Sequence, residues 1–219
     1  MKLLALIDGN SLLHRAFHAL PPMNAKDGTP TGALFGFLSM LLKVVAEEKP
    51  DGLLVAFDEH GPTFRHELFG EYKAGRQETP DELRVQFPIL RALLEKMGIR
   101  TVSKEGIEAD DILGIFSRKA AAKGVESLLI TGDKDALQLV SGNVTLLLMK
   151  KGISETLRVT PEVLFELYGV TPEGMIEVKS LMGDSSDNIP GVPGVGEKTA
   201  LKLIREYGTL DEVLNHIDE

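Results

Sequence analysis

Three strand-length apolar segments of this chain each lead into an aspartate. The segments are residues 2–7, 52–57 and 127–131, and the aspartates are Asp8, Asp58 and, one glycine further on, Asp133. Continuous apolar runs of this length, bounded by turn residues, are typical of strands buried on both faces of a parallel sheet. Open α/β sheets place their chemistry at the carboxyl ends of such strands. The repetition predicts a sheet with an acidic edge, although an aspartate after a strand can also be only a turn former.

Helical and extended segments alternate through most of the chain. Residues 32–48 and 112–116 carry apolar side chains at helical spacing, and residues 99–102 and 144–149 are further strand candidates. Repeated strand–helix–strand units favour a parallel sheet with helices on both faces. The expected fold class is therefore α/β, with a central, mostly parallel sheet.

A dense group of carboxylates precedes the helix that is expected to begin near residue 110. Glu108, Asp110 and Asp111 fall within four residues. Burying like charges so close together is costly unless a cation neutralises them, and oxygen ligands suit Mg²⁺ and Mn²⁺. A solvated acidic helix face is the alternative for this triple alone. Similar acids at the ends of the other segments strengthen the metal interpretation, namely Asp8, Asp58, Asp133, Asp135, Asp184 and Asp187.

Residues 61–96 are the most basic and aromatic part of the chain. Arg65, Tyr72, Lys73 and Arg76 stand out in it. Basic and aromatic side chains interleaved in a loop suit phosphate contacts and base stacking. A solvated basic loop is the alternative interpretation.

Beyond residue 160 the chain is expected to be helical. Thr-Pro-Glu sequences at 160–162 and 171–173 are typical helix starts. A glycine-rich turn at 191–199 opens a further helix, and its backbone N–H groups would be free for a phosphate. The turn matches neither a P-loop nor a dinucleotide fingerprint. An ordinary tight turn between two helices would have the same appearance.

The overall charge of the chain does not decide its partner. A formal net charge of −9 argues against a polyanion, but the remaining surface is neutral if nine acids bind metal. The 219 residues include no cysteine, which excludes disulfides and thiolate metal sites and suits a reducing cytosol. The chain shows neither a signal peptide nor an apolar run of ~20 residues. We therefore expect a soluble cytoplasmic protein without a membrane partner.

Eight short motifs occur in order over nearly the whole chain. They are LIDGNS (6–11), AFD (56–58), TFRH (63–66), YKAGR (72–76), EADD (108–111), TGDKD (131–135), GDSSDN (183–188) and GVPGVGEKT (191–199). Together they resemble the 5′-nuclease (flap endonuclease-like, 5′-3′ exonuclease) domain found at the amino terminus of bacterial DNA polymerase I. Each motif alone is weak, but their combination is specific.

The resemblance implies two parts. Residues 1–159 would be a catalytic α/β core of the PIN/5′-nuclease type, with a helical arch at about 61–98. Residues 160–219 would be a helical DNA-binding subdomain with a helix–three-turn–helix. Family domains usually continue for several tens of residues beyond this turn, so we expect a fragment or a truncated domain. A polymerase domain on the same natural chain would be compatible with this.

The resemblance also implies a function, which is structure-specific 5′-3′ exonuclease and 5′-flap endonuclease action on duplex, branched or flap DNA in primer removal and repair. Two Mg²⁺ ions would take part, with Mn²⁺ as a substitute. The first ion would be bound mainly by Asp8, Asp58, Glu108 and Asp110, and the second mainly by Asp133, Asp135 and Asp187. Asp111 and Asp184 would bind directly or through water.

The basic and glycine-rich motifs would handle the DNA. Lys73 and Arg76 would contact the scissile phosphate, Tyr72 would stack on a base, and Arg65 would bind another phosphate. The helix–three-turn–helix would grip the duplex backbone, with K⁺ on its carbonyl groups. Its predicted contact residues are Gly191, Gly194, Val195, Gly196, Lys198 and Thr199.

Three rival functions fit the sequence less well. A non-catalytic branched-DNA-binding module would not need all nine acids. RNA-directed nucleases of the PIN type usually lack the arch and the helix–three-turn–helix. A haloacid-dehalogenase-like phosphatase needs Asp-x-Asp after its first strand, whereas this chain has Asp8-Gly9-Asn10.

Overall fold

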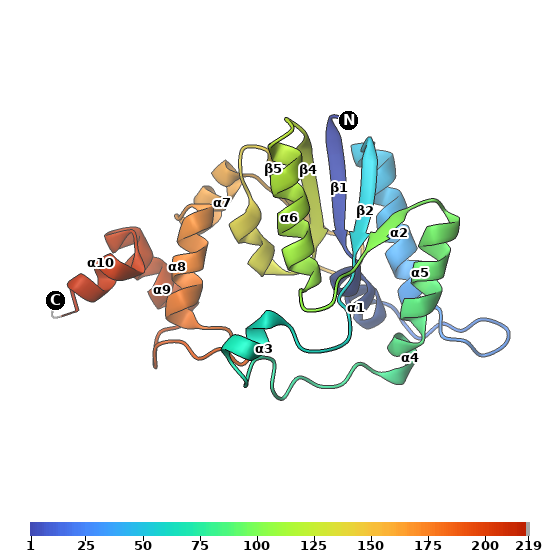
Figure 1. Ribbon diagram of the computed structural model, residues 1–219, viewed down its shortest axis with the longest axis horizontal. Coiled ribbons are helices and arrows are strands. Elements are labelled where there is room, and N and C mark those ends of the chain that lie inside the picture. Colours follow the sequence, from blue (N-terminus) through green and yellow to red (C-terminus); the bar gives the residue numbers. More distant parts are fainter. Residues whose placement is uncertain (218–219) are drawn as a thin grey trace.

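The computed structural model describes residues 1–217. Its centre is a six-stranded sheet in the order β3-β2-β1-β4-β5-β6 (Figure 1). Neighbouring strands are parallel except β5 and β6, which are antiparallel. The predicted α/β class with a mostly parallel sheet is confirmed. The strands are β1 (Leu3–Asp8), β2 (Gly52–Ala56), β3 (Arg100–Val102), β4 (Glu126–Thr131), β5 (Val144–Met149) and β6 (Thr156–Val159).

The central strand β1 brings the acidic strand ends together. Ile7 pairs with Val55 on one side and with Ile130 on the other, and all three residues are fully buried. Burial on both faces is what their continuous apolar sequences predicted. Asp8 therefore ends β1 next to the ends of β2 and β4, the two strands that lead into Asp58 and the 133–135 acids.

One face of the sheet is covered by α1 (Gly9–Ala19), α2 (Gly32–Glu48) and α5 (Gln86–Lys96). Helix α2 has the bounds predicted from its periodicity. Helix α1 was not predicted, because Gly9 and Asn10 resembled a turn. It begins directly after β1 because the Asp8 carboxylate accepts a hydrogen bond from the Ser11 N–H at 2.9 Å, which caps the helix.

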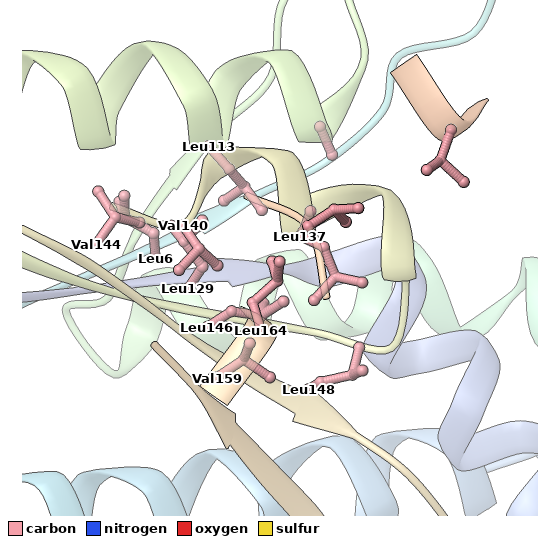
Figure 2. Close-up of a cluster of buried hydrophobic side chains, with 14 of the residues drawn as sticks. Leu6, Leu113, Leu129, Leu137, Val140, Val144, Leu146, Leu148, Val159 and Leu164 are labelled. Atoms are coloured by element: carbon pink, nitrogen blue, oxygen red, sulfur yellow. The ribbon is translucent and has the colours of Figure 1, made fainter. Parts of the chain in front are cut away.

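The opposite face is covered by α6 (Ala109–Ala121), the 3-10 helix η1 (Lys134–Leu139), α7 (Pro161–Tyr168) and α8 (Pro172–Met182). Leu113, Leu137 and Leu164 from these elements meet Leu129 and Leu146 of the sheet in one buried cluster (Figure 2). Helices therefore lie on both faces, as the alternating pattern predicted.

The C-terminal part is helical, with α9 (Glu197–Tyr207) and α10 (Leu210–Asn215) after α8. Thr160 and Thr171 cap α7 and α8 through their side chains, as the Thr-Pro-Glu sequences predicted. Strand β6 was not predicted, because it is only four residues long and lies in the short segment between a turn and α7. None of the helices within residues 1–217 combines the length and hydropathy needed to cross a bilayer.

The segment expected to form a helical arch is helical only in parts. It contains the short helices α3 (Phe64–Leu68) and α4 (Asp81–Arg84), followed by α5, whereas residues 69–80 are turns and coil. We call residues 69–80 the strap. Lys73 and Gly75 have φ angles of 56° and 83°, which interrupt a right-handed helix. The strap passes below the carboxyl edge of the sheet, between α3 and α4 (Figure 1).

Candidate metal and nucleic-acid site

A cleft of about 810 Å³ lies at the carboxyl edge of the sheet. Lys73 and Arg76 of the strap line it. Asp111 and Asp184 line adjoining cavities that share acids with this cleft. The structure therefore gathers all nine predicted metal ligands in one region. The seven that line the cleft itself are Asp8, Asp58, Glu108, Asp110, Asp133, Asp135 and Asp187.

Four of these acids have no basic partner. Asp8, Asp58, Asp110 and Asp133 take part in no ion pair among the described residues. Asp8 is buried and accepts hydrogen bonds from the Ser11 N–H and the Thr131 hydroxyl, both at 2.9 Å. Asp58 accepts a hydrogen bond of 2.7 Å from the first N–H of α6. Neutral donors therefore orient Asp8 and Asp58 but leave their charge uncompensated.

Burial and uncompensated negative charge raise the pKa values of two of these carboxyl groups. Burial raises the pKa of Asp8 to about 7, and the charges of Asp58 and Asp110 add to that rise. Burial and the charge of Asp111 raise the pKa of Asp110 to about 6. Such acids need a nearby cation to be fully ionised at neutral pH. An all-oxygen donor set fits a hard divalent ion such as Mg²⁺ or Mn²⁺.

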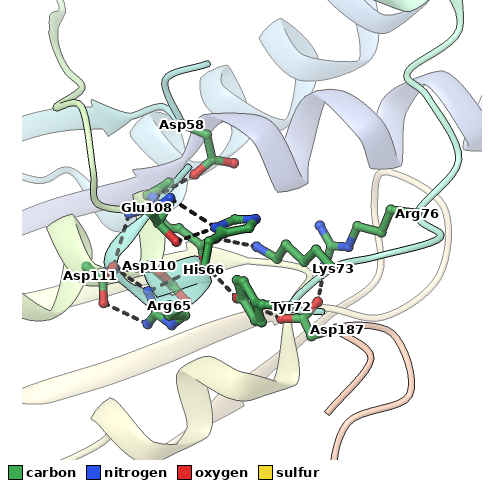
Figure 3. Close-up of polar contacts among 12 residues, drawn as sticks. Asp58, Arg65, His66, Tyr72, Lys73, Arg76, Glu108, Asp110, Asp111 and Asp187 are labelled. Atoms are coloured by element: carbon green, nitrogen blue, oxygen red, sulfur yellow. Dashed lines mark hydrogen bonds and ion pairs between the residues drawn. The ribbon is translucent and has the colours of Figure 1, made fainter. Parts of the chain in front are cut away.

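The strap contacts a second set of acids (Figure 3). Lys73 Nζ lies 2.6 Å from Glu108 Oε1, and the Arg76 guanidinium donates to the Asp187 carboxylate. The Lys73 N–H also donates to the Asp187 carbonyl oxygen at 2.8 Å. The Tyr72 hydroxyl lies 3.0 Å from both Glu108 Oε2 and Asp187 Oδ2. These contacts fix the strap across the acids.

Tyr72 is the strap residue whose position differs most from expectation. Its side chain is buried, with 5% exposure, so its ring is not available for base stacking in this arrangement. Burial and the charges of Glu108 and Asp187 hold the pKa of Tyr72 well above its ordinary value. The hydroxyl therefore stays protonated and bridges the two acids. Stacking on a base would require the strap to move.

Arg65 faces Asp111, whereas the sequence had suggested a free phosphate contact. The guanidinium donates hydrogen bonds of 2.7 and 2.8 Å to the two oxygens of the Asp111 carboxylate. That carboxylate also accepts from the Glu108 N–H at 3.0 Å, in a capping box that starts α6. Helix α6 therefore begins at Ala109, with Glu108 just before it, as the spacing of the acids predicted. Asp111 is held by protein donors on both of its oxygens.

Lys179 of α8 joins two further acids. Its Nζ lies 2.7 Å from Asp135 Oδ1 and 2.7 Å from Asp184 Oδ2. Burial acts to raise the pKa of Asp184, but hydrogen bonds from Lys179 and Ser186 outweigh burial and lower that pKa to about 2. The sequence analysis missed Lys179, because nothing in the α8 sequence indicates that its ammonium reaches an acid on η1.

The acids as they stand do not form a ready metal cage. Within residues 1–217, no group of three or more histidine, aspartate or glutamate side chains is arranged to hold an ion. Metal binding at the trio of Asp8, Asp58 and Asp110 would displace no protein cation. Asp133 is likewise without an ion pair among the described residues, whereas the remaining five acids already face a lysine or arginine, namely Glu108, Asp111, Asp135, Asp184 and Asp187.

The glycine-rich turn joins α8 to α9 outside the residues that line the cleft. A Cβ at Gly191 would lie 2.2 Å from a backbone carbon of α8, so the close approach of the two segments requires glycine. Gly194 has φ of 81°, and Gly196 precedes the first residue of α9. Lys198 and Thr199 are exposed in the first turn of α9, whose N–H groups have no partner within the helix. This geometry suits phosphate binding.

Comparison with known proteins places the chain in a family. Residues 3–169 match the family model described as the 5′-3′ exonuclease, N-terminal resolvase-like domain, and residues 170–219 match the 5′-3′ exonuclease, C-terminal SAM fold. The chain belongs to the 5′-3′ exonuclease family. DNA polymerase I of Bacillus caldotenax is 53% identical over 218 residues, which cover 100% of this chain and 25% of that protein. The chain thus spans about a quarter of the length of the curated relatives it matches.

Solved structures of other proteins show the same fold as this chain. The T5 5′-exonuclease with bound divalent zinc is 25% identical with a TM-score of 0.78, over 100% of this chain and 80% of that one. A bacteriophage T5 flap endonuclease in complex with DNA and metal ions is 24% identical with a TM-score of 0.77, over 99% and 79% of the two chains. The flap-endonuclease-like fold and the 5′-3′ exonuclease family are confirmed.

The raised pKa of Asp8 predicts how the stability of the protein depends on pH. The native protein binds the Asp8 proton more tightly than the unfolded chain, so its stability falls as pH rises from about 4 to about 7. We expect the Tm measured in EDTA to fall over this pH range. In Asp8→Asn the decrease in Tm over the same range should be smaller by about 5 °C or more. Mg²⁺ should restore the Tm of the unsubstituted protein at pH 7.5.

Thermal unfolding monitored by circular dichroism checks this prediction. Asparagine retains the carbonyl oxygen that accepts the Ser11 N–H, so the cap of α1 is kept while the charge is removed. The exposed Asp211 serves as a control, because Asp211→Asn should leave the pH profile unchanged. A profile for Asp8→Asn that is identical to that of the unsubstituted protein would contradict the prediction.

Proposed function

We propose that this chain hydrolyses phosphodiester bonds of DNA at 5′ ends and 5′ flaps, as a structure-specific nuclease of primer removal and repair. The observation that carries the proposal is the cleft in which Asp8, Asp58 and Asp110 lack basic partners while Lys73 and Arg76 lie on its wall. The T5 relatives solved with metal ions and with DNA support it. A cytoplasmic location and a polymerase domain on a longer natural chain are part of the proposal, because the relatives are DNA polymerases I.

Two divalent ions, Mg²⁺ with Mn²⁺ as a substitute, would be held by the acids of the cleft. When bound, such ions activate a water nucleophile and stabilise negative charge on the phosphoryl oxygens. Asp111 would act indirectly, since Arg65 and a backbone N–H already engage its oxygens. The proposed ligands are Asp8, Asp58, Glu108 and Asp110 for the first ion and Asp133, Asp135 and Asp187 for the second, with Asp184 beside the second.

The strap would supply the protein's own positive charge to the reaction. The Lys73 ammonium would leave Glu108, and the Arg76 guanidinium would leave Asp187, to contact the scissile phosphate. Negative charge grows there in the transition state, so donors placed beforehand stabilise it more than the ground state. Tyr72 would orient Glu108 and Asp187 through its hydroxyl.

The C-terminal helices would hold the duplex. In the proposed division, residues 1–159 carry the chemistry and residues 160–219, of which the last two lie outside the described residues, bind DNA. Backbone N–H groups near Gly194, Val195 and Gly196, with Lys198 and Thr199, would contact phosphates without reading base sequence. A K⁺ ion on the carbonyl groups of the 191–199 turn is also part of the proposal.

Cleavage of a 5′-labelled flap duplex tests the proposed function. We expect short labelled products in Mg²⁺ or Mn²⁺, and none in EDTA or Ca²⁺. A single-stranded oligonucleotide and a blunt duplex of the same sequence serve as substrate controls, because recognition should depend on DNA structure. Tight flap binding without products in Mg²⁺ would favour the non-catalytic DNA-binding module instead.

A further inference from the structure

Lys179 holds a single positive charge between two acids that lie on separate segments. Asp135 belongs to η1, and Asp184 lies in the loop after α8, each 2.7 Å from the Lys179 ammonium. The Lys179 side chain is 34% exposed, whereas that of Asp184 is 15% exposed. The ammonium therefore occupies the space that both carboxylates face, while its flexible stem still reaches solvent.

This arrangement contrasts with that of Asp8, Asp58 and Asp110. A divalent ion can approach those three acids without displacing a protein cation. An ion bound by Asp135 and Asp184 together would have to displace the Lys179 ammonium, because two cations at the same carboxylate oxygens repel each other. The energy needed to displace the ammonium lowers the apparent affinity for that ion.

We propose that Lys179 is a positioning residue that holds Asp135 and Asp184 in place and delays binding of the second divalent ion until DNA is present. The inference rests on the proposed two-ion function. A phosphate of the bound DNA offers the ammonium another anionic partner within reach of its stem. Once Lys179 turns to that phosphate, both carboxylates are free for the ion.

This exchange couples the two ligands. Because coupling between two binding sites is reciprocal, DNA tightens binding of the second ion and the second ion tightens binding of DNA. Without DNA, the protein binds one ion well and the second weakly. Both divalent ions are then bound together only when DNA is present.

Metal titration without DNA tests the proposal independently of activity. Lys179→Met removes the charge at similar side-chain length, Lys179→Gln removes it but keeps a hydrogen-bond donor, and Lys179→Arg retains it. Lys202→Met, on the exposed surface of α9, is the matched control. Calorimetry with Mg²⁺ and electron paramagnetic resonance with Mn²⁺ report the affinity of each ion at constant ionic strength.

We expect the second ion to bind about tenfold more tightly to the Met and Gln variants than to the unsubstituted protein, with the first ion unchanged. The Arg variant and Lys202→Met should match the unsubstituted protein. Adding a flap duplex with an uncleavable phosphate analogue should raise the affinity of the unsubstituted protein for the second ion. The difference in this affinity between the unsubstituted protein and the Met and Gln variants should then become smaller. Circular dichroism identifies any variant that does not fold, and the Gln variant then decides the result.

Two results would overturn the role of Lys179. One is a second ion that binds equally or more weakly in the charge-removing variants. The other is an unsubstituted protein that binds both ions equally well without DNA. Failure of the proposed function has a different signature, because the unsubstituted protein would then neither bind an ion at Asp8, Asp58 and Asp110 nor cleave the flap.

Discussion

Replacing Asp110 with alanine is expected to abolish cleavage while leaving the fold intact. Asp110 lies in the first turn of α6, lines the main cleft and has no ion-pair partner among the described residues. Loss of an acid that binds a catalytic ion removes several kcal/mol of transition-state stabilisation, so we expect the rate to fall by about 10³-fold or more. The fold should tolerate the change, since ionised Asp110 is repelled by its neighbours.

Single-turnover cleavage of the labelled flap in Mg²⁺ measures this effect, and thermal unfolding checks the fold. Glu105→Ala is the matched control, because Glu105 lies in the loop just before α6 but is exposed and does not line the cleft. Near-normal cleavage by Asp110→Ala would refute the assignment of this acid to the metal site.

Replacing Lys73 with alanine should slow the chemical step far more than it weakens DNA binding. The ammonium is 2.6 Å from Glu108 at the wall of the cleft, within the region where a scissile phosphate would lie. Removing one charged donor from a transition state typically costs about 10²- to 10³-fold in rate. The same change should weaken flap binding only a few-fold, since one phosphate contact among many is lost.

Binding measured in Ca²⁺ and single-turnover cleavage measured in Mg²⁺ separate the two effects. Lys73→Arg retains the charge and should recover part of the rate, and Lys104→Ala, at an exposed site, should change neither quantity. If Lys73→Ala lowers the affinity for the flap and the cleavage rate by the same factor, Lys73 only binds DNA and does not stabilise the transition state.

The sheet and its acidic edge could be predicted from sequence because the signals are local. The strands β1, β2 and β4 are continuous apolar runs, and Asp8, Asp58 and Asp133 lie at or within two residues of their ends. Parallel pairing then places the ends of β1, β2 and β4 at one edge, which is a consequence of sheet geometry. The sequence also indicated the capped starts of α7 and α8, since Thr-Pro-Glu is itself the cap.

Other features depend on contacts between distant segments. Helix α1 is set by the Asp8 cap, whereas the sequence predicted Asp8 as a metal ligand at a strand end and gave no sign that it starts a helix. Arg65 pairs with Asp111, 46 positions away, and Tyr72 pairs with Glu108, 36 positions away. Lys179 pairs with Asp135, 44 positions away, so no local sequence pattern shows any of these contacts. The sequence predicted which residue types the site contains. It did not predict that lysines and arginines already face most of its acids.

The starts of α1 and α6 have an electrostatic consequence for an acidic protein with the proposed DNA substrate. Asp8 caps α1, and Glu108 with Asp111 caps α6, so both helices direct their N-termini at the acids of the cleft. Each N-terminus carries a partial positive charge of roughly half a unit from aligned peptide dipoles. The backbone therefore adds positive potential at the place where the side chains are most negative. A phosphate chain can approach this edge against a smaller repulsion than the formal charge of −9 implies.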